Sequence, residues 1–228
     1  MKKFFVLFSA LVLSIIVFSQ TQYPVVVMET TMGVMKFELY DNTFRHSDNF
    51  VKLVKDGYYN GQLFHRVIKD FMIQAGDNMS NIAKPGESLG HGGKKYTIPA
   101  EFFPEYYHRK GALAAARQPD NINPNKESSG SQFYIVQGQV FDTLILAKFV
   151  EKKMHVPFTP EQTEIYVTQG GTPHLDYNYT VFGMIMEGLD VLENISKVPT
   201  DTRDRPLTDV RIIKMFTEEN KYNEGQNK

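Results

Sequence analysis

The segment 64–77, with the sequence FHRVIKDFMIQAGD, constrains the fold of this chain more than any other stretch. Its apolar residues form two short runs separated by Lys69 and Asp70, a pattern typical of two strands joined by a tight turn. Arg66 and Gln74 interrupt these runs. An arginine in an apolar run either extends its stem along the core to a structural ion pair or belongs to a site. The segment alone leaves both readings open.

Other segments also have the pattern of strands. Residues 24–40 read as a β-hairpin, because Met35, Phe37 and Leu39 alternate with charged residues after a turn that contains Gly33. The same reasoning predicts further strands at 111–116, 133–136, 180–183 and 210–216. Many short strands with few helices favour a closed or nearly closed antiparallel barrel.

Helical spacing of apolar residues appears in three places. Residues 47–56 predict a helix capped by Ser47 and ended by Gly57, and residues 188–197 predict another. Between them, residues 138–172 predict a helical hairpin. Its first helix is indicated by spaced apolar residues from Phe141 to Met154, and its second by the capping box of Thr159-Pro160-Glu161-Gln162.

Composition bounds the possible functions. The chain has 228 residues, 42% hydrophobic and 22% charged, which suits a single domain with its own core. A formal net charge of −1 without a basic run argues against nucleic acid as a partner. The absence of cysteine excludes disulfides and thiol chemistry, and the six histidines lack the spacing of metal ligands. We therefore expect no metal and no cofactor.

The first residues have the pattern of a secretory signal peptide. A basic start, Met1-Lys2-Lys3, precedes an uncharged apolar run from Phe4 to Phe18. This run is shorter than the about 20 residues that a comfortable transmembrane helix needs. We expect residues 1–19 to be removed by cleavage near Gln20, with an uncleaved membrane anchor as the alternative. The mature chain would then be exported to a periplasm or the cell envelope.

Four sequence blocks occur in a recognisable order. They are FHRVIKDFMIQAGD, GALAAAR, SSGSQFYIV and HLDYNYTVFG. Together they resemble the signature blocks of cyclophilin-type peptidyl-prolyl cis-trans isomerases over residues 23–217, apart from the helical segment 138–172. The resemblance implies a mainly β fold, an eight-stranded antiparallel barrel capped by two helices, here with an inserted helical hairpin. The remaining residues, 218–228, form a polar tail.

The resemblance also implies an activity and a set of site residues. The activity is cis–trans isomerisation of X-Pro peptide bonds, with proline-containing peptides and unfolded or exported proteins as partners. Arg66 falls on the family's catalytic arginine, and Gln74 could orient it and bond to the substrate. His65 matches a flanking histidine whose role we take to be mainly structural. The predicted substrate-binding residues are Phe71, Met72, Ala116, Arg117, Gln132, Tyr134, His174, Leu175 and Tyr179.

Elementary chemistry agrees with these residue types. Rotation about a peptide bond crosses about 18–20 kcal/mol because amide resonance is lost. In the twisted state the prolyl nitrogen regains a lone pair, which a permanently charged guanidinium such as that of Arg66 can hydrogen-bond. Apolar residues such as Phe71, Met72, Tyr134 and Leu175 could bury the proline ring. No nucleophile and no metal is required.

The chain departs from the family pattern at several positions. Arg117 stands where many members have asparagine, and Tyr134 where phenylalanine is usual. His174 replaces a tryptophan, and Tyr179 replaces a histidine. The segment 138–172 begins and ends beside the predicted pocket, so it either shapes access to the groove and docks client proteins or packs on the barrel as a surface hairpin.

Two functions follow from these observations. The first is a prolyl isomerase that assists the folding of exported proteins, which the presence of Arg66 favours. The second is a peptide-binding chaperone with little turnover, which the changes at His174 and Tyr179 keep open. The sequence contains no coiled-coil pattern, so we expect a monomer.

Overall fold

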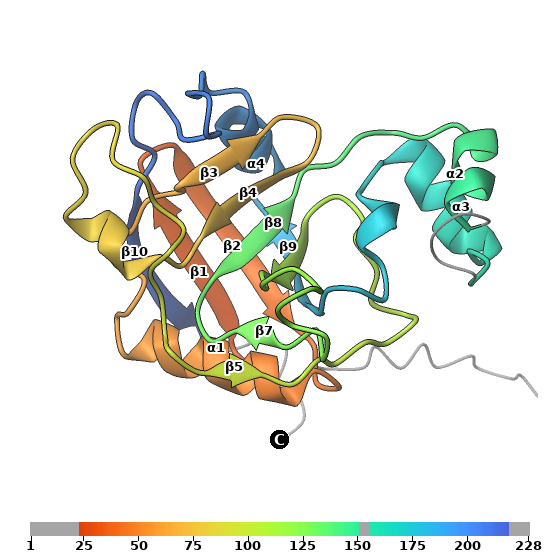
Figure 1. The fold of residues 1–228 in the computed structure, drawn as a ribbon, viewed down its shortest axis with the longest axis horizontal. Helices are drawn as coiled ribbons and strands as arrows, with labels where there is room; N and C mark the ends of the chain where they lie inside the picture. The colour runs from red at the N-terminus through yellow and green to blue at the C-terminus, as the bar shows by residue number, and fades with distance from the viewer. Residues whose placement is uncertain (1–22, 151–155, 219–228) are drawn as a thin grey trace, which may run out of the picture.

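The computed structural model describes residues 23–150 and 156–218 (Figure 1). The predicted signal peptide, Met154 and the polar tail beyond residue 218 lie outside the described residues. The main sheet has eight antiparallel strands in the order β10-β1-β2-β9-β6-β8-β4-β3. These strands are β1 (Val25–Thr30), β2 (Gly33–Leu39), β3 (Arg66–Ile68), β4 (Met72–Ala75), β6 (Ala112–Ala115), β8 (Phe133–Val136), β9 (Val181–Glu187) and β10 (Ile212–Glu218).

Backbone hydrogen bonds bring the two edges of this sheet together. Phe64 N donates to Val210 O at 2.9 Å. Ile212 N donates to Gln62 O at 2.8 Å, so the chain just before β3 pairs with the chain at the start of β10. The sheet therefore curls into a barrel, and the mainly β, eight-stranded fold predicted from the sequence is confirmed. A separate small sheet pairs β5 (Thr97–Ile98) with β7 (Ser128–Ser129).

Two helices cover opposite ends of the barrel (Figure 1). Helix α1 (Phe44–Lys55) packs against β10 and β9, and α4 (Leu189–Ser196) packs against β2, β3 and β4. Inside the barrel, Met35, Phe37 and Leu39 are fully buried, as their alternation predicts. The core owes its stability to this burial of apolar surface.

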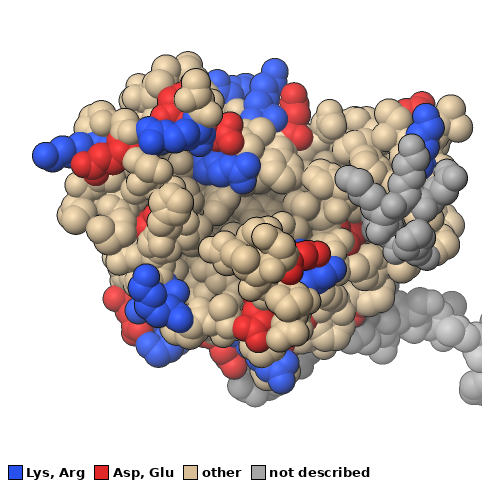
Figure 2. Space-filling view, in the orientation of Figure 1, with Lys and Arg blue, Asp and Glu red and all other residues tan. Residues whose placement is uncertain are grey.

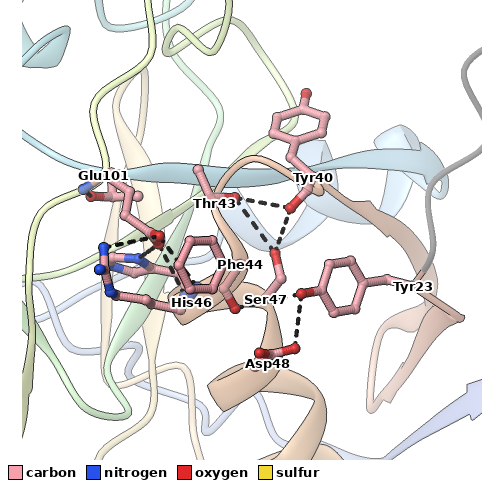
Figure 3. Close-up of polar contacts among 10 residues, drawn as sticks. Tyr23, Tyr40, Thr43, Phe44, His46, Ser47, Asp48 and Glu101 are labelled. Atoms are coloured by element: carbon pink, nitrogen blue, oxygen red, sulfur yellow. Dashed lines mark hydrogen bonds and ion pairs between the residues drawn. The ribbon is translucent and has the colours of Figure 1, made fainter.

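The predicted start of the first helix was wrong. Helix α1 begins at Phe44, so Ser47 lies within the helix and its Oγ donates to Tyr40 O at 2.9 Å. The cap is supplied from elsewhere in the chain. As Figure 3 shows, the Glu101 carboxylate accepts from the backbone N–H of His46 at 3.2 Å and contacts its ring Nδ1 at 2.6 Å. A carboxylate at a helix N-terminus satisfies free N–H groups and favours the helix dipole.

The last strand does not alternate strictly. The pairing of β10 with β1 is irregular at Ile213, which is exposed, while Ile212 and Met215 are both buried. A bulge of this kind moves the residues that follow it to the opposite face of the sheet. The sequence alternation of 210–216 therefore breaks within the strand.

Two helices form in segment 138–172, as predicted. Helix α2 (Thr143–Phe149) and helix α3 (Pro160–Thr168) lie together at one side of the barrel (Figure 1). The capping box is confirmed, because Gln162 N donates to Thr159 Oγ1 at 3.1 Å and Thr159 N donates to Gln162 Oε1 at 2.9 Å. Within the described residues, none of the helices is both long enough and apolar enough to span a membrane.

Candidate active site

The register of four neighbouring strands places polar and small residues in one row. Arg66 on β3 pairs with Gln74 on β4, Gln74 pairs with Tyr134 on β8, and Tyr134 pairs with Ala114 on β6. Directly paired residues project from the same face of a sheet, and their chain neighbours project from the other. Ile73 accordingly points into the barrel core, whereas the row faces outward.

A groove with a volume of about 510 Å³ lies over this row. Figure 2 shows the surface hollowed over β4 and β8, with Lys and Arg atoms along the upper edge of the hollow. We call it the proline groove, after the substrate residue that the sequence resemblance predicts there. The structure brings together nine of the predicted site residues, which are Arg66, Phe71, Met72, Gln74, Ala116, Arg117, Tyr134, Leu175 and Tyr179. The two others, Gln132 and His174, each contact a residue that lines the groove.

Arg66 is held at the wall of the groove by Asp204. Its Nε donates to Asp204 Oδ2 at 3.3 Å, and the two side chains are 42% and 41% exposed. Asp204 is fixed in turn, because its carbonyl accepts from the backbone N–H of Val67 at 2.8 Å. Asp204 is the ion-pair partner of Arg66 within the described chain, and it engages Nε and not the terminal amino groups of this groove-lining arginine. The sequence analysis missed Asp204, which lies 138 positions further along the chain.

Gln74 does not orient Arg66, contrary to the expectation from the sequence. Its Nε2 donates to Gln132 Oε1 at 3.0 Å. Gln132 in turn donates to Gly90 O at 3.0 Å and to Gly92 O at 2.8 Å. Gln132 therefore fixes the amide of Gln74 and ties the groove to the loop at residues 90–92.

His174 lies at the rim of the groove, between the barrel and helix α2. Its ring stacks on Phe71 with a centroid distance of 5.7 Å and contacts Phe149 of α2 at 6.1 Å. His174 follows Pro173 in the short 3₁₀ helix η3 (Pro173–Leu175), whose Leu175 lines the groove. Segment 138–172 therefore reaches the groove through an aromatic contact at its rim.

Two departures from the family pattern pack against each other. The Arg117 guanidinium lies over the Tyr179 ring, 4.4 Å from its centroid. The same guanidinium donates to Asn178 O at 2.7 Å and pairs with Asp120 at 2.6 Å, and the Arg117 side chain is only 4% exposed. These contacts hold the Arg117 side chain in one position, where it forms part of the groove wall.

A buried chain of hydrogen bonds joins the floor of the groove to helix α3. The Tyr134 hydroxyl lies 2.9 Å from His108 Nε2, and His108 Nδ1 lies 2.8 Å from Asp176 Oδ1. The Tyr166 hydroxyl of α3 donates to Asp176 Oδ2 at 2.7 Å. All four side chains are buried. The sequence analysis singled out only Tyr134, because residues this far apart carry no shared periodicity.

The direction of the protons in this chain follows from its chemistry. A carboxylate only accepts, so His108 Nδ1 carries the hydrogen that points toward Asp176, and the Tyr134 hydroxyl bonds to the other ring nitrogen, Nε2. Burial raises the pKa of Tyr134 and of Tyr166 well above 10.0, so both hydroxyls are neutral donors. Tyr134, Tyr166 and His108 thus all have hydrogen-bond partners within this buried chain.

Known proteins share this sequence pattern. The family model "Cyclophilin type peptidyl-prolyl cis-trans isomerase/CLD" matches residues 25–217. A Staphylococcus aureus protein (strain USA300) with the name "Putative peptidyl-prolyl cis-trans isomerase" is 38% identical over 195 residues, covering 85% of this chain and 91% of the relative. A Staphylococcus epidermidis protein of the same name matches with the same identity and coverage. The chain belongs to the family of cyclophilin-type peptidyl-prolyl cis-trans isomerases.

Solved structures share the fold. A Cryptosporidium parvum cyclophilin-type peptidyl-prolyl cis-trans isomerase is 26% identical, with a TM-score of 0.61, over 86% of this chain and 98% of the other. A second structure of that enzyme, in the presence of the dipeptide Ala-Pro, has a TM-score of 0.60 at 25% identity, over 86% of this chain and 99% of the other.

The buried chain predicts energetic coupling between helix α3 and the floor of the proline groove. Tyr134→Phe leaves His108 Nε2 without its partner, and Tyr166→Phe removes a donor from Asp176, so each should lower the free energy of unfolding by about 1–3 kcal/mol. Because both hydroxyls belong to one network, the double variant should deviate from additivity by about 0.5 kcal/mol or more. Urea unfolding of the four proteins measures this.

The control for this cycle is Tyr96→Phe, which removes an exposed hydrogen bond to Asn49 Oδ1 from a residue that is 46% exposed. Water replaces an exposed partner, so its cost should be smaller than that of Tyr134→Phe. Strict additivity of Tyr134→Phe and Tyr166→Phe, or equal costs for all three changes, would show that the chain does not couple α3 to the groove.

Proposed function

We propose that this chain accelerates cis–trans isomerisation of X-Pro bonds in exported proteins and so assists their folding. The observation that carries the proposal is the placement of Arg66. Its guanidinium is a permanent cation that pairs with Asp204 through Nε, and its side chain lines a groove with an apolar floor. That pairing of a donor with an apolar floor is what the reaction requires.

The floor of the proline groove suits a proline ring. Met72 and Tyr134 are buried under it, and Phe71 and Leu175 pack against the same cluster. Burying the apolar ring there removes it from water and holds one side of the X-Pro bond in place. The other side of the bond then stays free to rotate, which is the motion that the reaction needs.

Arg66 would act on the rotating amide. Conjugation of the prolyl nitrogen with its carbonyl is lost as the bond twists, and the nitrogen gains a lone pair. A terminal N–H of Arg66 that meets this lone pair stabilises the twisted state more than either planar isomer. Gln74, fixed by Gln132 at 3.0 Å, is placed to hydrogen-bond the peptide backbone beside the proline. No covalent bond is made or broken.

A solved relative supports the choice of ligand. The Cryptosporidium parvum enzyme was solved in the presence of Ala-Pro, the smallest X-Pro unit. We carry that ligand class to this chain because nine residues predicted from the family pattern line one groove. The second candidate, a peptide-binding chaperone with little turnover, would use the same groove without stabilising the twisted state.

Arg66→Ala tests the proposal. The full chain should accelerate isomerisation of an Ala-Pro peptide, followed by NMR exchange, and the variant should lose about a hundredfold or more in kcat/KM. The change should leave the stability nearly intact, because an exposed ion pair contributes less than about 1 kcal/mol. Arg45→Ala is the matched control, since Arg45 is a 51% exposed arginine that pairs with Glu101.

Each outcome of this experiment separates the candidate functions. Peptide binding without any acceleration by the full chain would exclude the enzyme and favour the chaperone. An active chain whose Arg66→Ala variant is equally active would remove Arg66 from the mechanism. Equal losses in Arg66→Ala and Arg45→Ala would point to a general effect of removing surface charge.

We also propose that the chain works outside the cytoplasm. The support is the basic start and the uncharged apolar run that ends at Phe18. The lack of cysteine suits an oxidising compartment, where free thiols would be oxidised. Client proteins would then be chains that fold after export, in a periplasm or at the cell envelope.

Expression of the full chain in a bacterium with a periplasm tests this second proposal. The protein should appear in the periplasmic fraction with an N-terminus near Gln20 by mass spectrometry, and a variant lacking residues 1–19 should remain in the cytoplasm. Full-length protein in the membrane fraction would identify an uncleaved anchor instead. Cytoplasmic full-length protein would contradict export.

A further inference from the structure

A second groove adjoins the proline groove and shares two of its residues. It has a volume of about 540 Å³ and includes Arg66 and Gln74, so these two side chains stand between the two grooves. We call it the second groove. Its other lining residues are His65, Glu87, Ser88, Leu89, Gly90, Arg203 and Arg205. The family resemblance gave none of these residues a role in binding.

The wall of the second groove is fixed by hydrogen bonds. Arg205 is buried, and its Nη1 donates to Lys84 O at 3.0 Å and to Glu87 O at 2.7 Å. Gly90 N donates to Asp77 Oδ2 at 2.6 Å. The loop at residues 84–90 is therefore held against the barrel in one position.

Hydrogen-bond donors dominate this wall. Three arginines line the groove, and Glu87 is the one carboxylate among its lining residues. Each of these arginines pairs with an aspartate outside the lining: Arg66 with Asp204 at Nε, Arg205 with Asp209, and Arg203 with Asp201 at 3.7 Å. The upper edge of the hollow in Figure 2 carries Lys and Arg atoms accordingly.

His65 adds an unused polar group to the same wall. Its side chain is buried, with 4% exposure, and neither ring nitrogen has a hydrogen-bond partner among the described residues. Buried polar atoms without a partner cost free energy, so they commonly mark a place where a ligand or water completes the site. Burial lowers the pKa of His65 from 6.5 to about 4, so at pH 7 the neutral ring offers one N–H donor.

We propose that the second groove is a subsite for the carboxylate of an acidic side chain that flanks the proline of the substrate. The inference deepens the proposed function and rests on it. A peptide whose proline lies on the floor of Met72 and Leu175 passes Arg66 and Gln74 as it leaves the proline groove. A neighbouring residue of that peptide then enters the second groove, where charged donors bind a carboxylate more strongly than a neutral amide.

Peptides that differ only in one flanking residue test the subsite. Glu and Gln have the same shape and differ in charge, so a series carries either residue at each position on both sides of the proline. At one position or more, kcat/KM of the full chain should be about three- to tenfold higher for the Glu peptide. Lys at that position should give the lowest value.

Arg203→Gln provides the matching variant. Arg203 lines the second groove and not the proline groove, and its side chain is 52% exposed, so the change is compatible with folding. It should lower the Glu-to-Gln ratio of kcat/KM toward one. The control is Arg45→Gln, because Arg45 is a 51% exposed arginine on α1. This variant should keep the wild-type Glu-to-Gln ratio of kcat/KM.

The outcomes distinguish failure of the subsite from failure of the function. Equal kcat/KM for Glu and Gln peptides at every position, on an active enzyme, would overturn the subsite alone. A Glu preference that Arg203→Gln leaves unchanged would also overturn it. No acceleration of any peptide would overturn the proposed function, and binding titrations of the same peptides would then still decide whether the second groove prefers Glu.

Discussion

The antiparallel register of β3, β4, β8 and β6 is the constraint on which the rest of the site depends. It sets Arg66, Gln74, Tyr134 and Ala114 opposite one another on the outer face of the barrel. If the register of any of these strand pairs shifted by one residue, the shifted side chains would point into the barrel core instead. The backbone hydrogen bonds between these strands thus place a cation beside an apolar floor at the surface.

The departures from the family pattern are compensated within the structure. Arg117 and Tyr179 replace two other residues but stack on each other at 4.4 Å, so they form one wall. Tyr134 carries a hydroxyl where phenylalanine is usual, and this hydroxyl hydrogen-bonds with His108 Nε2 at 2.9 Å. Through Asp176, that hydrogen bond leads on to Tyr166 in α3. The altered floor and the helical segment are therefore two ends of one network.

The sequence predicts the parts of the site that follow local patterns. The resemblance over segment 64–77 assigned Arg66, Met72 and Gln74 to one site, and the three line one groove because strand alternation and register put them on the same face. It missed contacts between distant loops. Asp204 beside Arg66 and Glu101 at the start of α1 depend on how the loops cross the barrel, and no local periodicity records that arrangement. The bulge at Ile213 was missed for a related reason, since it depends on pairing with β1.

A crystal structure of the full chain with a bound X-Pro peptide tests the central claim most directly. The account predicts the proline ring on the floor of Met72 and Leu175, with a terminal nitrogen of Arg66 within hydrogen-bond distance of the prolyl amide, about 2.7–3.2 Å. A proline ring seated elsewhere, or an Arg66 guanidinium turned away from that amide, would contradict it.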